Sequence, residues 1–78
     1  MLHVGFGNFV KQDKILAITI PGTAPLRRKR QAAEKKDLLI DCTNGASTRS
    51  LIHLSDGYIV LSTVNSNILI DRMGEVSD

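Results

Sequence analysis

The sequence predicts a small single domain of the α+β class, with a mainly antiparallel sheet, one basic helix and a short C-terminal helix. A chain of 78 residues is long enough for one domain only. Short apolar segments are separated by glycine-containing turn dipeptides, as in antiparallel sheets, and two segments have the capping residues of helices. Apolar residues make up 42% of the chain, which argues against disorder. We assign residues 1–75 to this domain and expect residues 76–78 to be a flexible tail.

The N-terminal part predicts three strands. Residues 2–4 and a segment that begins near Phe9 are separated by Gly5-Phe6-Gly7-Asn8, which is typical of a tight turn. This turn is not a dinucleotide-binding motif, because the third glycine is missing and no helix pattern follows. Residues 14–20 are rich in β-branched side chains and end at Pro21-Gly22, so they predict a further strand.

Residues 23–36 predict a helix that carries most of the positive charge. Thr23 is a suitable N-cap, and Pro25 falls in the first turn, where its missing amide costs no hydrogen bond. Residues 25–37 hold six Lys or Arg and two Asp or Glu, a charge of +4, whereas the other residues together carry −2. This segregation suits an anionic partner. From charge alone, however, a solvated helix face is the more common explanation.

The C-terminal half predicts a three-stranded meander. Asn44-Gly45 is a strong hairpin signal that would join a strand at residues 38–43 to a return strand at about 47–54. Asp56-Gly57 then predicts a second turn, which leads into a strand at residues 58–64.

A two-residue loop at Asn44-Gly45 would set the register of the first pair, with Asp41 opposite Thr48 and Ile40 opposite Arg49. After the meander, Asn65 or Ser66 would cap a short helix, with Gly74 after its end.

The meander would have two apolar faces. One would carry Leu39, Ile52, Leu54, Ile59 and Leu61, and the other Leu38, Ile40, Cys42, Leu51 and Val60. Two helices are too few to cover both faces, so we expect self-association. In the alternative, the N-terminal strands fold back over the second face, and periodicity favours neither arrangement.

Residues suited to catalysis or metal binding are scattered. His3 and His53 lack acidic or cysteine neighbours at metal-ligand spacing, and Asp41 and Cys42, adjacent in a strand, would point to opposite faces. We therefore expect no enzyme, metal, cofactor or small-molecule substrate. No apolar run reaches the roughly 18 residues that cross a bilayer, and no export signal is visible, which predicts a cytoplasmic protein without membrane contact.

An ordered set of motifs resembles the RemA-like bacterial regulators of extracellular-matrix genes. The set comprises Gly5-Phe6-Gly7-Asn8, Ala24-Pro25 with the basic helix, Leu39-Ile40-Asp41, Thr43, Gly45, Thr48-Arg49 and Leu61-Ser62, and the match extends from about residue 3 to Arg72. The resemblance implies an α+β subunit that assembles into a ring and binds double-stranded DNA. Such a protein would be a nucleoid-associated transcriptional regulator of biofilm-matrix genes.

The resemblance also implies where DNA is bound. Lys14 matches a basic residue that follows the first bend of the family, and Arg49 matches the arginine that closes the family's Gly-Arg-Arg-Thr-Arg run. Ala46 and Ser47 stand where that run has two consecutive arginines. The basic helix is a candidate replacement, so the predicted DNA contacts are Lys14, Arg27, Arg28, Lys29, Arg30 and Arg49.

A ring would repeat these cations, so many phosphates could be contacted at once and the affinity would fall steeply with salt. We expect contacts with the duplex backbone and its shape rather than readout of base edges. Two alternatives are an oligomeric scaffold that has lost DNA binding with the two arginines, and a binder of structured RNA. The aromatic content of 4% is low for stacking on single strands.

Overall fold

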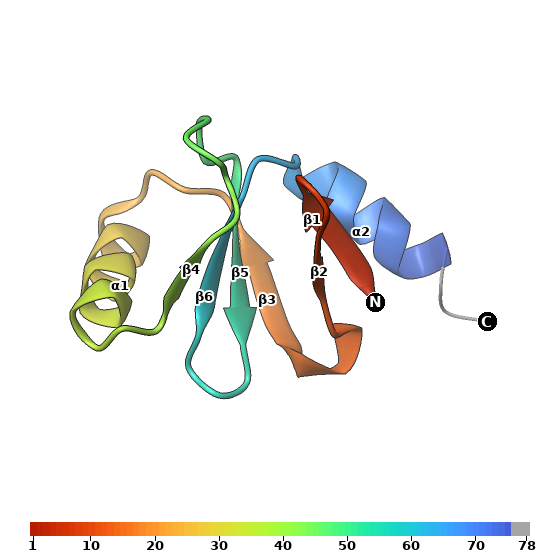
Figure 1. Ribbon diagram of the computed structural model, residues 1–78. Helices are drawn as coiled ribbons and strands as arrows, with labels where there is room; N and C mark the ends of the chain where they lie inside the picture. The colour runs from red at the N-terminus through yellow and green to blue at the C-terminus, as the bar shows by residue number, and fades with distance from the viewer. Residues whose placement is uncertain (76–78) are drawn as a thin grey trace.

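A four-stranded sheet forms the centre of the computed structural model, which describes residues 1–75 (Figure 1). Its strand order is β3 (Ile15–Thr19), β5 (Ser50–Leu54), β6 (Ile59–Ser62) and β4 (Leu39–Asp41). A separate two-stranded sheet consists of β1 (Leu2–Gly5) and β2 (Asn8–Val10). The helices are α1 (Ala24–Lys35) and α2 (Ser66–Glu75), and a short 3-10 helix, Gln12–Lys14, precedes β3. The α+β class and the mainly antiparallel pairing are confirmed.

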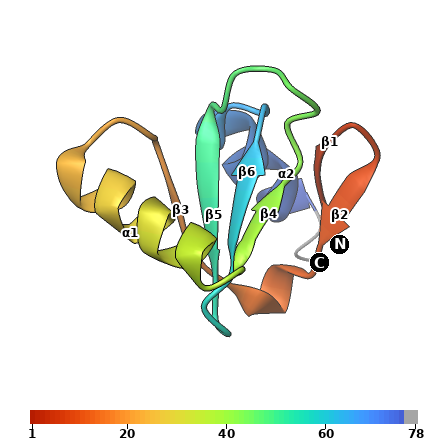
Figure 2. The ribbon, with the colours of Figure 1, turned by 60° about the vertical axis from the view of Figure 1, so that its left-hand side comes forward.

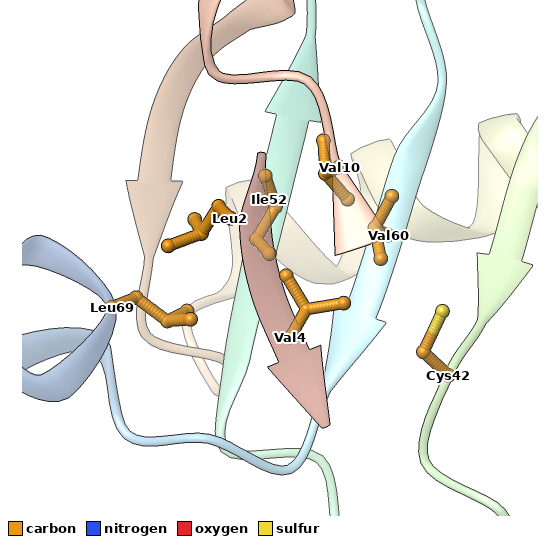
Figure 3. Packing of buried hydrophobic residues seen from close by; sticks show 7 residues of the cluster. All are labelled: Leu2, Val4, Val10, Cys42, Ile52, Val60 and Leu69. Carbon is orange, nitrogen blue, oxygen red and sulfur yellow. The ribbon is translucent and has the colours of Figure 1, made fainter. Parts of the chain in front are cut away.

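The elements form three layers (Figures 1 and 2). Helix α1 covers one face of the four-stranded sheet, called here the α1 face, where the buried cluster is Ala33, Leu51, Ile59 and Leu61. The β1–β2 hairpin and α2 cover the opposite face, called here the hairpin face. Figure 3 shows the buried cluster of the hairpin face, which is Leu2, Val4, Val10, Cys42, Ile52, Val60 and Leu69.

The N-terminal hairpin has the predicted turn. Gly5, Phe6 and Gly7 have φ values of 111°, 50° and 76°, and a Cβ on Gly5 would lie 3.0 Å from Thr63 Oγ1. Glycine at position 5 therefore satisfies both the left-handed backbone and the close approach. The hydroxyl of Ser62 donates to the carbonyl oxygen of Val4 at 2.7 Å, which ties the hairpin to the sheet.

Both helices form where they were predicted, but their ends differ in detail. Thr23 occupies the N-cap position of α1 without a capping side-chain hydrogen bond, and Asp37, with φ of 60°, closes its C-terminus. The side chain of Asn65 accepts the Asn67 amide at 2.8 Å, which confirms Asn65 as the cap of α2. The prediction that Gly74 follows the helix is wrong, because α2 continues to Glu75. The tail expected at residues 76–78 lies outside the described residues.

The predicted three-stranded meander is wrong in one pairing. The β5–β6 hairpin forms around Asp56-Gly57, but β4 pairs with β6, in parallel, and not with β5. Asn44 and Gly45 do form a tight turn, with φ values of 52° and 84°, and the chain then crosses to the start of β5 on the far side of β6. Every residue of β6 is buried, so β6 belongs inside the sheet, whereas Ile40 and Asp41 of β4 are exposed at its edge.

The pairing also corrects the predicted register and faces. Asp41 is paired with Leu61 and Ile40 with Val60, so neither lies opposite the residues expected from a two-residue hairpin. Ile52 pairs with Val60 on the hairpin face, and Leu51 pairs with Leu61 on the α1 face, which breaks up both predicted groups. The alternative in which the N-terminal strands fold back over the second face is confirmed.

Candidate nucleic-acid interface

Helix α1 presents its cations to solvent. Ala33 is its buried residue and Leu26 is half-buried, so the helix contacts the sheet through a thin apolar stripe. Arg27, Arg28 and Lys29 are exposed, and Arg30 is half-buried. The first turn contains no acidic residue, so the cations add to the positive end of the helix dipole. The outer surface of α1 is therefore strongly positive at its N-terminal half.

The cations of α1 are spread along the length of the sheet. Arg27 and Arg30 line a depression of about 250 Å³ beside the loop between β3 and α1, where Arg27 also donates to the Gly22 carbonyl oxygen at 3.3 Å. Lys29 lines a different depression, together with His53 and Tyr58, near the β5–β6 turn. An extended anion could therefore run along the helix.

Arg49 lies at the same end of the sheet as the start of α1. It precedes β5, is exposed, and its backbone amide donates to the Ser62 carbonyl oxygen at 2.8 Å. Because β3 and β5 are antiparallel, with Thr19 opposite Leu51, the last residues of β3 and the first residues of β5 lie at the same end of the sheet. In Figure 1 this end of the sheet is at the top, together with the loop that follows β4.

Lys14 lies at the opposite end. It directly precedes β3, and its carbonyl oxygen accepts the backbone amide of Ser55, just after β5, at 2.7 Å. The five residues of β5 lie between the level of Lys14, at Ser55, and Arg49, a distance of roughly 20 Å along the strand. Lys14 also lines a groove on the hairpin face, whereas α1 lies on the other face. Within one chain, the structure does not gather Lys14 with the other predicted contacts.

An acidic group that sequence reasoning did not connect with the cations lies beside them. Asp41, at the exposed end of β4, accepts hydrogen bonds from the hydroxyl and the amide of Thr43. These bonds are the main cause that lowers the pKa of Asp41, and the positive charge of Arg30 contributes. The ionised carboxylate offsets part of the potential of Arg30, so Arg27, Arg28 and Lys29 are the stronger candidates for phosphate contacts.

Ala46 and Ser47 are exposed in the loop that precedes Arg49. The turn is closed by a hydrogen bond from the Ala46 amide to the Thr43 carbonyl oxygen at 3.0 Å. Side chains at positions 46 and 47 would thus project from the same end of the sheet as Arg49. The chain carries no charge at these two positions.

Cys42 and His53 are both buried inside the domain. Burial is the main cause that raises the pKa of the Cys42 thiol, so Cys42 packs as a neutral, small apolar residue. His53 is buried on the α1 face, and burial is the main cause that lowers its pKa. Among residues 1–75, no group of three or more His, Cys, Asp or Glu could hold a metal ion, and no helix there is long and apolar enough to cross a membrane.

Comparison with known proteins identifies similar chains over nearly the whole length. A family model described as RemA-like, "Extracellular matrix regulatory protein A-like", matches residues 1–73. A protein of Thermodesulfovibrio yellowstonii is 35% identical over 77 residues, which cover 99% of this chain and 91% of the relative. Proteins of Bacillus cytotoxicus and Bacillus mycoides are each 36% identical over 77 residues, which cover 99% of this chain and 88% of each relative. All three carry the name "Putative regulatory protein".

Proposed function

Because this chain belongs to the RemA-like family of regulatory proteins, we propose that it is a DNA-binding transcriptional regulator that acts as a ring-like homo-oligomer. The observation that carries this proposal is the solvent-exposed cluster of cations on α1, a helix held to the sheet by a thin apolar stripe. The charge of this surface suits a polyanion, and duplex DNA is the polyanion that we propose for a member of a regulatory family.

The duplex backbone is the proposed target within DNA. Arg27, Arg28 and Lys29 offer point charges and forked donors suited to phosphate oxygens, and Arg49 extends the positive surface at one end of the sheet. Lys14 supplies a contact at the other end. Arg30 adds a weaker one, because it is half-buried and the Asp41 carboxylate offsets part of its potential. Phosphate contacts position a protein without reading sequence, so specificity would come from the shape and bendability of the target.

Repetition around an assembly provides the affinity. A single copy neutralises few phosphates, whereas linked copies make each later contact intramolecular, at a high effective concentration. The site of action would be the nucleoid in the cytoplasm, and the family description suggests extracellular-matrix genes as targets.

A salt titration of duplex affinity, combined with a mass measurement, tests this function. The variant Arg27→Glu/Arg28→Glu/Lys29→Glu/Arg30→Glu should lose duplex binding while its oligomeric mass stays unchanged. The matched control is Lys35→Glu/Lys36→Glu, which reverses charges at the opposite end of the same helix and should retain most of the affinity. Unchanged duplex binding by the four-residue variant in an intact oligomer would show that α1 is only a solvated face.

A scaffold without DNA binding is the second candidate. The observation in its favour is that Ala46 and Ser47 occupy the exposed loop before Arg49. The family's Gly-Arg-Arg-Thr-Arg run has two consecutive arginines at these positions. An intact oligomer that shows no salt-dependent affinity for duplex DNA would favour the scaffold. Competition by structured RNA, but not by duplex DNA, would instead identify an RNA-binding protein.

A further inference from the structure

The four-stranded sheet is open at both of its edges. Among the described residues, β3 pairs only with β5 and β4 pairs only with β6, so the outer backbone groups of both edge strands have no strand partner. The two edge strands run in the same direction, because β3 and β6 are both antiparallel to β5 and β4 is parallel to β6. Unpaired edges of this kind are templates for pairing with another chain.

The β3 edge is apolar and uncharged. Leu16 is 72% exposed and Ile20 is 67% exposed, which are among the largest exposures of any large apolar residue in the described chain. Residues 15–20 contain no Lys, Arg, Asp or Glu, although charges are a common means by which proteins protect a free edge. The irregularity in the pairing of β3 lies before Ala17, so residues 17–19 form a regular edge.

The β4 edge borders an apolar groove on the hairpin face. The groove has a volume of about 360 Å³, and its apolar walls include Phe9, Val10, Ile40, Cys42, Leu54 and Val60. Lys11 and Lys14 also line it, and Lys14 lies at the Leu54 end, away from Cys42. Figure 3 shows Val10 on β2, Val60 on β6 and Cys42 directly after β4. Ile40, which is 40% exposed, stands at the rim beside the unpaired edge. The groove therefore has room for apolar side chains supplied by another chain.

The two edges match in level along the strands. Ile40 pairs with Val60, Val60 with Ile52, and Ile52 with Ile18, so Ile18 and Ile40 lie level on one face at opposite edges. Ile20 and Cys42 each follow two residues later. The exposed Ile20 at the β3 edge is therefore level with Cys42, which lines the groove at the β4 edge.

We propose that β3 of one copy packs beside β4 of the next, with Ile20 in the apolar groove of the hairpin face. This inference rests on the self-association included in the proposed function and assigns the surfaces that make it. Two different patches meet, so the contact is head-to-tail and generates a closed ring or an open filament. The two edge strands would meet in parallel. A rotation about an axis along the strands leaves the strand direction unchanged, so it can relate one copy to the next.

This arrangement determines where the cations lie in the assembly. Every copy contributes α1 to the same side of a shared sheet, so the cluster of Arg27, Arg28 and Lys29 recurs once per copy as a positive band. A band of this kind provides the repeated backbone contacts that the proposed function requires.

Site-directed cross-linking tests the interface. Ile20→Cys and Ile40→Cys are made separately in a Cys42→Ala background, mixed, allowed to exchange subunits and treated with a short bis-maleimide. The mixture should give a linked dimer, whereas each variant alone should give none, since a head-to-tail contact never brings two identical positions together. A mixture of Ile70→Cys, at an exposed position on α2, with Ile40→Cys is the matched control and should remain unlinked.

A mass measurement separates this proposal from the proposed function. Ile20→Glu should release subunits of 8.5 kDa, whereas Ile70→Glu should keep the wild-type mass, with circular dichroism confirming that both variants fold. A monomeric wild-type chain at micromolar concentration would overturn both the assembly and the interface. An oligomeric wild-type chain whose mixed cysteines do not link, or whose single variants link to themselves, would overturn the interface alone.

Discussion

Nε2 of His53 lies 2.8 Å from Oγ1 of Thr19, whereas Nδ1 of the same ring is buried without a hydrogen-bond partner. The network therefore assigns the proton of the neutral ring to Nε2, because a proton on Nδ1 would leave a buried donor unpaired. A second proton would place an unpaired charge beneath α1. Burial, with a smaller effect of the Lys29 charge, accordingly lowers the pKa of His53.

The stability of the domain should decrease as the pH falls from about 7.5 to about 5.5. The pKa of His53 is lowered from 6.5 by folding, so the unfolded chain binds the proton first. The free energy of unfolding is therefore highest above pH 6.5 and falls below it by about 1.4 kcal/mol for each unit of difference in pKa. His53→Gln, which keeps an amide near Thr19, should give a flatter profile in urea denaturation. Parallel profiles for the two proteins would contradict this explanation.

Ser62→Ala should destabilise the domain by about 1–3 kcal/mol, because one buried and one partly buried backbone group lose their partner. The Ser62 hydroxyl donates to the Val4 carbonyl oxygen and accepts the Val64 amide at 3.0 Å. Urea denaturation measures the loss, and hydrogen exchange should show that protection of β1 decreases most. Ser55→Ala, at an exposed position, should change stability by less than about 0.5 kcal/mol. Equal losses in the two variants would count against this link between hairpin and sheet.

Arg28→Gln should reduce the salt dependence of duplex binding. Each phosphate contact contributes about 0.9 to the slope of log affinity against log salt, so an assembly loses that amount for every copy that contacts DNA. Lys36→Gln, which removes an equal charge beyond the end of α1, should leave the slope nearly unchanged. Fluorescence anisotropy between low and physiological salt measures both slopes. Identical slopes in the two variants would remove Arg28 from the proposed interface.

Ala46→Arg/Ser47→Arg should raise the affinity for duplex DNA and steepen its salt dependence. Both positions are exposed at the end of the sheet that carries Arg49, so the new charges join an existing positive surface without displacing any core residue. Each productive contact adds about 0.9 to the slope. The matched variant Ala46→Gln/Ser47→Gln adds length without charge and should bind like the wild type. An equal gain in both variants would show that charge is not its cause.

Local signals predicted most elements of this fold. Pro25 near the start of α1, Asn65 before α2 and Asp56-Gly57 between β5 and β6 act within a few residues, and each is found where it was expected. Asn44-Gly45 also makes the turn that its residue types favour. The dipeptide does not decide which strand lies beside β4, because that choice depends on burying β6 between two neighbours.

The candidate site was predictable as a set of exposed cations but not as an arrangement. Exposure of Arg27, Arg28 and Lys29 follows from the few apolar positions of their helix. The separation of Lys14 from Arg49 depends on the antiparallel pairing of β3 with β5, a contact between segments more than thirty residues apart. Asp41 and Arg30 come together for a similar reason, through the packing of α1 beside β4.

The strand order has a consequence for how the chain acquires its structure during synthesis. β3 and β4 are both made before the strands with which they pair, since their partners are β5 and β6. A nascent chain that ends before residue 50 can contain the N-terminal hairpin and a helix, but none of the central sheet. The last-made hairpin is thus the template on which the earlier strands assemble, and folding cannot advance steadily behind the ribosome.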